Sequence, residues 1–178
     1  MSRYFLTIVF SLFLIGQSSG QQIVEDIGHY IQIGLPLTSL GISVGKGDMK
    51  GALQLLESFA VETAIVITMK RAINRKRPNG GQFSFPSGHT AVSFMSSTYL
   101  WKRYGWEYGV PATALAAFVG YSRFGTDDPV HYFSDVVAGA AIGIGSSLLL
   151  TKRQKKDVQV DVIGDLSFLG LRLKMNLN

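Results

Sequence analysis

Three short segments of the chain carry the residue types that phosphate chemistry uses. They are Lys70 with Arg77 and Pro78, then Pro86-Ser87-Gly88-His89, and finally Arg123 followed by His131 and Asp135. A phosphoryl group in transfer spreads negative charge over three equatorial oxygens, and fixed cations stabilise that charge without reorganising. Lys70, Arg77 and Arg123 are therefore candidate phosphate-binding residues.

The second segment adds the start of a helix. Ser87 is a favourable N-cap, and Gly88 lets a ligand approach the backbone closely. The first turn of a helix presents free N–H groups and the positive end of the dipole to an anion. We therefore expect Ser87 and Gly88 to contribute to phosphate binding.

The histidines suggest a nucleophile and a proton carrier. His131 and Asp135 are four residues apart, which on a helix places them on one face. A carboxylate on one imidazole nitrogen fixes the tautomer and makes the other nitrogen more nucleophilic. His89 is then the candidate for proton transfer to the leaving oxygen and from the attacking water. His29 has no acidic partner at matching spacing, and we expect it to be structural.

Taken in this order, the segments resemble the three-part signature of the type 2 phosphatidic acid phosphatase superfamily, which also includes bacterial acid phosphatases and vanadium haloperoxidases. The stretch 85–90, Phe-Pro-Ser-Gly-His-Thr, is its most specific part. The resemblance implies a phosphohistidine on His131, acid/base chemistry at His89 and orientation of His131 by Asp135. It implies phosphate binding by Lys70, Arg77, Ser87, Gly88 and Arg123, with no metal and no cofactor.

One spacing departs from the family pattern, which usually has five residues between the arginine and the histidine of the third motif. Here seven residues separate Arg123 from His131. Pro129 can restart the chain before the helix and keep His131 and Asp135 in register. The extra length therefore bears on the placement of Arg123.

The hydrophobic pattern predicts an all-α bundle of five helices, at about 27–44, 51–73, 87–103, 111–121 and 131–150. Their apolar character predicts a transmembrane bundle, in which the spacing Gly139-x-x-x-Gly143 lets two helix backbones approach closely. Alternation of apolar and polar residues after Asp157 predicts a β-hairpin with one apolar face and a turn at 163–165.

The amino terminus has a basic start, a dozen apolar residues and then small residues, which is the layout of a secretory signal peptide. We predict a signal peptide over 1–20, with a retained anchor helix as the alternative, a helical domain over 21–151 and a tail over 152–178. The net charge is +5, without cysteine, and the aromatic and glycine signatures of nucleic-acid modules are missing. Nucleic acid is therefore not an expected partner, whereas a membrane and a phosphorylated lipid or small phosphoester are.

Clusters of Lys and Arg at 46–50, 102–103 and 152–156 agree with one orientation, in which these ends face the cytoplasm. The cluster at 70–77 would then lie outside, so its charge needs another use. We expect an enzyme of the bacterial inner membrane whose site faces the periplasm. The alternatives are a soluble periplasmic acid phosphatase with the same site, or a non-catalytic lipid-binding membrane protein.

Overall fold

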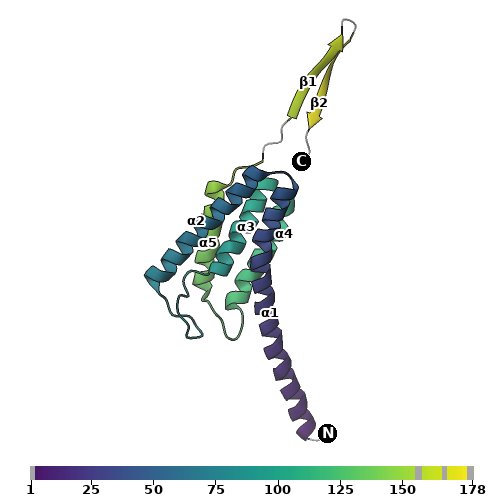
Figure 1. Ribbon diagram of the computed structural model, residues 1–178. Coiled ribbons are helices and arrows are strands. Elements are labelled where there is room, and N and C mark those ends of the chain that lie inside the picture. The colour runs from purple at the N-terminus through teal and green to yellow at the C-terminus, as the bar shows by residue number, and fades with distance from the viewer. Residues whose placement is uncertain (1–2, 155–157, 166–167, 176–178) are drawn as a thin grey trace.

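The computed structural model describes residues 3–154, 158–165 and 168–175, and the side chains of residues 20–154. Five helices and one hairpin follow in chain order: α1 (Arg3–Gly45), α2 (Met49–Ile73), α3 (Gly88–Tyr104), α4 (Trp106–Phe124), α5 (Phe133–Leu150), β1 (Val158–Asp165) and β2 (Phe168–Met175). Figure 1 shows the helices packed side by side as a bundle. The predicted all-α bundle with a C-terminal hairpin is confirmed.

Two helices begin at least one turn earlier than predicted, and the other three begin within two residues of the predicted positions. The predicted signal peptide and first helix form one continuous helix, α1, with Pro36 inside it. The start of α4 was predicted at Pro111, but α4 begins one turn earlier. The N–H of Gly109 reaches the carbonyl of Gly105 over 3.0 Å, and Trp101 of α3 covers Gly109, where a Cβ would lie 2.5 Å from that side chain. This packing supports a turn ahead of the proline.

Helices α3 and α5 pack with their backbones in contact. A Cβ on Gly139 would lie 2.3 Å from the carbonyl oxygen of Ser87, and one on Gly143 would lie 2.1 Å from that of Ala91. Only glycine fits at such distances. The spacing of small residues in α5 thus acts as predicted, and it fixes α5 against the first turns of α3.

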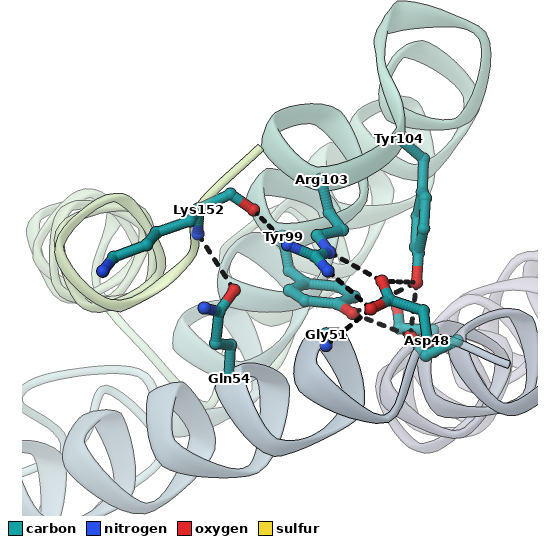
Figure 2. Close-up of polar contacts among 9 residues, drawn as sticks. Asp48, Gly51, Gln54, Tyr99, Arg103, Tyr104 and Lys152 are labelled. Carbon is teal, nitrogen blue, oxygen red and sulfur yellow. Dashed lines mark hydrogen bonds and ion pairs between the residues drawn. The ribbon is translucent and has the colours of Figure 1, made fainter. Parts of the chain in front are cut away.

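The opposite end of the bundle is held by a buried ion pair (Figure 2). The guanidinium of Arg103 donates to both carboxylate oxygens of Asp48, and the hydroxyl of Tyr104 donates to the same carboxylate over 2.9 Å. Asp48 also caps α2 by accepting from the N–H of Gly51. Arg103 reaches the carbonyl of Lys152 as well, over 2.7 Å, so one arginine in the last turn of α3 joins the start of α2 to the segment that follows α5.

Among the residues that the structure describes, two helices, α2 and α5, are long and apolar enough to cross a membrane. Only 28% of the apolar window of α2 and 33% of that of α5 is buried in the bundle. A core helix of a soluble protein would be mostly buried, so these surfaces fit contact with lipid better than a solvated exterior.

The hairpin strands pair antiparallel, with Val158, Val160 and Val162 opposite Met175, Leu173 and Leu171. The predicted turn at Ile163-Gly164-Asp165 is wrong, because these residues belong to β1 and pair with residues 168–170 of β2. Glycine and aspartate are common in turns, but here the backbone pairing of the two strands continues through them. Within the described ranges the two strands contact only each other.

The α3–α5 contact predicts unequal effects of two glycine-to-alanine changes in one helix. Gly143→Ala forces a Cβ into the backbone of α3 and should destabilise the fold by about 1–3 kcal/mol. Gly145→Ala, where nothing lies within 4 Å, should be neutral or stabilise by up to about 1 kcal/mol through helix propensity. Thermal unfolding in one detergent compares the two, and equal midpoints would contradict the packing.

Candidate functional site

Two loops, 74–87 and 125–132, lie at the same end of the bundle, opposite the ion pair of Figure 2, and α1 runs past them (Figure 1). Together with the helix ends beside them, they carry all the residues predicted for the site. Lys70 lies in the last turn of α2, Arg77 in the first loop, Ser87, Gly88 and His89 at the start of α3, Arg123 in the last turn of α4, and His131 and Asp135 around the start of α5.

Asp135 is fully buried at the start of α5 and holds the local backbone. Its Oδ2 accepts the N–H of Tyr132 over 3.0 Å, as in a capping box, and the helix begins only at Phe133. The helical spacing predicted for His131 and Asp135 is therefore wrong, because His131 precedes the helix. The two side chains are nevertheless close, with 3.7 Å between Nδ1 of His131 and Oδ2 of Asp135.

Ser84 stands between this histidine and this carboxylate, and sequence reasoning missed it. Its hydroxyl donates to Oδ2 of Asp135 and lies 3.5 Å from Nδ1 of His131. Since a hydroxyl has one proton to donate, it can accept only from Nδ1–H of the histidine. This order of donors assigns the proton of neutral His131 to Nδ1 and leaves Nε2 with a free lone pair.

Arg75 is a second residue that the sequence did not single out. Its Nη1 donates to Oδ1 of Asp135 over 2.9 Å and to the hydroxyl of Ser134 over 2.8 Å, and its guanidinium lies 4.0 Å from the ring centroid of Tyr132. Arg75 thus neutralises the buried carboxylate. The sequence showed a cluster of basic residues at 70–77, but it did not show which of them would pair with Asp135.

His131 is 3% exposed, and its environment disfavours the imidazolium. Burial, with the nearby charges of Lys70 and Arg77, lowers the pKa of His131 to about 4. The opposing effect of Asp135 is smaller. At neutral pH the residue is therefore an unprotonated base, the form that a nucleophile requires.

Lys70 and Arg77 frame the loop that leads into α3. Nζ of Lys70 donates to the carbonyl of Phe83 over 2.8 Å, and Nε of Arg77 donates to that of Gln82 over 3.0 Å. A Cβ on Gly88 would lie 4.0 Å from Cε of Lys70, so the lysine passes directly beside the start of α3. The predicted cations and the helix start are thus brought together.

Ser87 is the N-cap of α3, as predicted, but its groups are used within the protein. Its hydroxyl pairs with that of Thr90 over 3.0 Å, and its N–H donates to the carbonyl of Asp135 over 2.9 Å. The donors that remain for an anion are the N–H groups of the first turn of α3, after Ser87. The position of Ser87 fits the site, whereas its backbone N–H serves to join α3 to α5.

The longer third motif closes on itself. The N–H of His131 donates to the carbonyl of Arg123 over 3.0 Å. This hydrogen bond holds the two ends of the loop 124–130 next to each other. This loop contacts α1, where Thr126 donates to Glu25 and the N–H of Asp127 donates to Gln21. The guanidinium of Arg123 also donates to α1, over 2.6 Å to the carbonyl of Glu25.

His29, which was expected to be structural, lies at the site. Its Nδ1 is 3.1 Å from Nε2 of His89, within hydrogen-bond distance. His89 is half-buried at the start of α3, within the electrostatic influence of Arg123, His131 and Arg77. No local pattern signals this contact, since the two histidines are 60 residues apart.

Comparison with known proteins agrees with this geometry. The model of the PAP2 superfamily matches residues 51–159. The chain is 27% identical over 150 residues to a lipid A 4'-phosphatase of Helicobacter pylori, covering 78% of this chain and 74% of that protein. It is 30% identical over 142 residues to a lipid A 1-phosphatase of Helicobacter pylori, covering 71% of this chain and 70% of that protein.

A solved structure shares the arrangement of the helices. The crystal structure of Aquifex aeolicus LpxE superposes with a TM-score of 0.63 at 25% identity, covering 79% of this chain and 92% of that one. The region that matches the family model covers more than half of the chain and includes every residue of the three motifs. The protein therefore belongs to the PAP2 superfamily, as its motifs predicted, and is a phosphatase.

Proposed function

We propose that this protein hydrolyses a phosphate ester of a membrane lipid through a phosphohistidine on His131, without a metal ion. The observation that carries this proposal is the buried unit of His131, Ser84 and Asp135, beside the cations Lys70 and Arg77. It leaves Nε2 of a neutral imidazole free to attack a phosphorus atom that the cations hold.

The reaction follows from this arrangement in two steps. Nε2 of His131 forms a bond to phosphorus as the bond to the leaving oxygen breaks, and protonated His89 gives its proton to that oxygen. The positive charge that forms on His131 is stabilised by Asp135 through Ser84. Water then attacks the phosphorus, His89 takes its proton, and phosphate departs as the nitrogen–phosphorus bond breaks.

A phosphorylated lipid is the substrate class that the exterior of the bundle favours. The apolar surfaces of α2 and α5 continue to the end of the bundle that carries the site, so a lipid phosphate at the membrane surface can reach it. The relatives from Helicobacter pylori are named for lipid A. Lipid A phosphates are therefore the first substrates to assay, followed by phosphatidate and polyprenyl diphosphates.

The first prediction concerns pH. Because the nucleophile must be neutral, kcat/KM should fall on the acid side as pH passes through the pKa of His131 near 4, and not near 6.5. Lys70→Met removes a neighbouring charge that lowers this pKa, so the acid limb should move to higher pH. The substrate ionises in the same way in the assays of the wild-type enzyme and of Lys70→Met, so it does not contribute to the difference between their pH profiles. An unchanged limb would contradict the assignment.

A second prediction separates the roles of the histidines. His131→Ala should abolish phosphate release and the labelled phosphoenzyme with every substrate. His89→Ala should slow an alkyl ester by about 10²–10⁴-fold but affect nitrophenyl phosphate least, because that leaving group needs little protonation. Rapid quench and mapping of the acid-labile phosphate test this. Label on His89 would reverse the roles, and no label on the wild-type enzyme would exclude the covalent step.

The third prediction places the site on the periplasmic side of the inner membrane, with residues 1–20 as the export signal, because the remaining basic clusters then face the cytoplasm. The chain has no cysteine, so an introduced thiol is the only one. Gly81→Cys, in the exposed loop 74–87, should react with an impermeant thiol reagent in intact spheroplasts. Gln154→Cys should react only after lysis, and the reverse pattern would overturn the orientation.

A further inference from the structure

All three histidines of the chain meet at one end of the bundle, and one of them has no role in the reaction described above. His29 comes from α1, outside the residues of the three motifs. Its ring centroid is 5.4 Å from that of His89, and a single hydrogen bond joins the two rings. This contact links α1 directly to the group that must move the proton.

The hydrogen bond uses a defined pair of nitrogens, Nδ1 of His29 and Nε2 of His89. Within residues 20–154, this is the one hydrogen bond that the His89 ring makes. Nδ1 of His89 is therefore the nitrogen left for the leaving oxygen and for water. When His89 is protonated, its Nε2–H can donate only to an acceptor, which in this geometry is Nδ1 of neutral His29.

The position of His29 is fixed by the residues beside it in α1. A Cβ on Gly28 would lie 2.0 Å from the hydroxyl oxygen of Ser122, so α1 and α4 touch at the preceding residue. The carbonyl of Glu25, one turn earlier, accepts from Arg123 over 2.6 Å. Although the His29 ring is exposed, its backbone is held against the helix that carries Arg123.

We propose that His29 is a positioning residue for His89, a role that rests on the proposed phosphatase reaction. Nδ1 of His29 accepts the hydrogen bond from Nε2–H of His89 throughout the reaction. This leaves Nδ1 of His89 as the nitrogen that releases and takes up the proton. Nδ1–H of His89 protonates the leaving oxygen as the phosphorus–oxygen bond breaks. Neutral His89 then retains its proton on Nε2, so that Nδ1 accepts the proton of the attacking water.

The charges around His89 explain why such an acceptor matters. Arg123 faces it from α4, Arg77 from the loop before α3, and His131 from the loop before α5, with His29 on α1. Burial, with the charge of Arg123 as the next largest cause, lowers the pKa of His89 to about 4 and so disfavours the imidazolium. A hydrogen bond accepted by a neutral ring favours it. His29 thus supports the protonated form of His89 that the first step needs.

The experiment compares three variants of the full chain in detergent. His29→Phe keeps a ring but removes the acceptor, His29→Asn offers an amide oxygen close to the position of Nδ1, and Tyr30→Phe changes the adjacent exposed residue as a control. Each is assayed from pH 5 to 9 with a short-chain phosphatidate and with nitrophenyl phosphate. Thermal unfolding of each variant checks the fold.

His29→Phe should lower kcat on the phosphatidate about 10- to 100-fold, the effect of losing one hydrogen bond to a charged group. It should change kcat on nitrophenyl phosphate only a few-fold, and its alkaline limb should lie at lower pH by about one unit. His29→Asn should recover most of the activity and of the pH profile, while Tyr30→Phe should match the wild-type enzyme.

Equal losses on the two substrates with an unmoved alkaline limb would overturn the proposal, and so would unchanged activity of His29→Phe. If His29→Phe does not fold, His29→Ala, which also removes the acceptor, decides the question: a loss confined to the alkyl ester with a shifted limb, smaller than the loss of His89→Ala, supports the role, and wild-type activity overturns it. Failure of the proposed function looks different, because the wild-type enzyme would then release no phosphate from any substrate.

Discussion

The contact between the backbones of α3 and α5 is the constraint on which the rest of the site depends. Gly139 lies against the carbonyl of Ser87, and the N–H of Ser87 donates to the carbonyl of Asp135. This single crossing sets the distance between the helix that carries His89 and the carboxylate beside His131. In lipid, where apolar burial does not drive helices together, such close packing is the main source of attraction between them.

The basic residues of the first motif divide into two groups with different tasks. Arg75 turns inward and pairs with Asp135, which is fully buried and would otherwise be an uncompensated charge. Lys70 lies beside the start of α3 and Arg77 in the loop before it, and both lower the pKa of His131. Because Arg75 pairs with the carboxylate, neither Lys70 nor Arg77 is taken up by an ion pair with Asp135.

The sequence was informative where a function depends on residues close together in the chain. The helix starts and ends, the small residues of α5 and the three motifs are local patterns, and they predicted the family and the residues that gather at one end. Ser84 and His29 could not be found in this way. Ser84 contacts partners about 50 residues away and His29 a partner 60 residues away, and their local surroundings resemble an ordinary loop and an ordinary helix.

The predicted contact between His131 and Asp135 is present, but the helical spacing from which it was predicted is not. Helical spacing suggested that His131 and Asp135 share a helix face, yet α5 begins after His131. Their proximity arises instead from the capping role of Asp135, which turns its carboxylate back toward the residues before the helix. A short spacing between two residues thus predicted their contact through a geometry different from the one assumed.

The closed loop after α4 separates two properties that are usually linked, the length of a segment and the geometry at its ends. The hydrogen bond from His131 to the carbonyl of Arg123 joins the two ends, so residues added between them extend the loop outward. The entropic cost of a longer loop rises only slowly with its length. Residues 124–130 can therefore be lengthened or rebuilt while Arg123 and His131 stay at the same distance from each other.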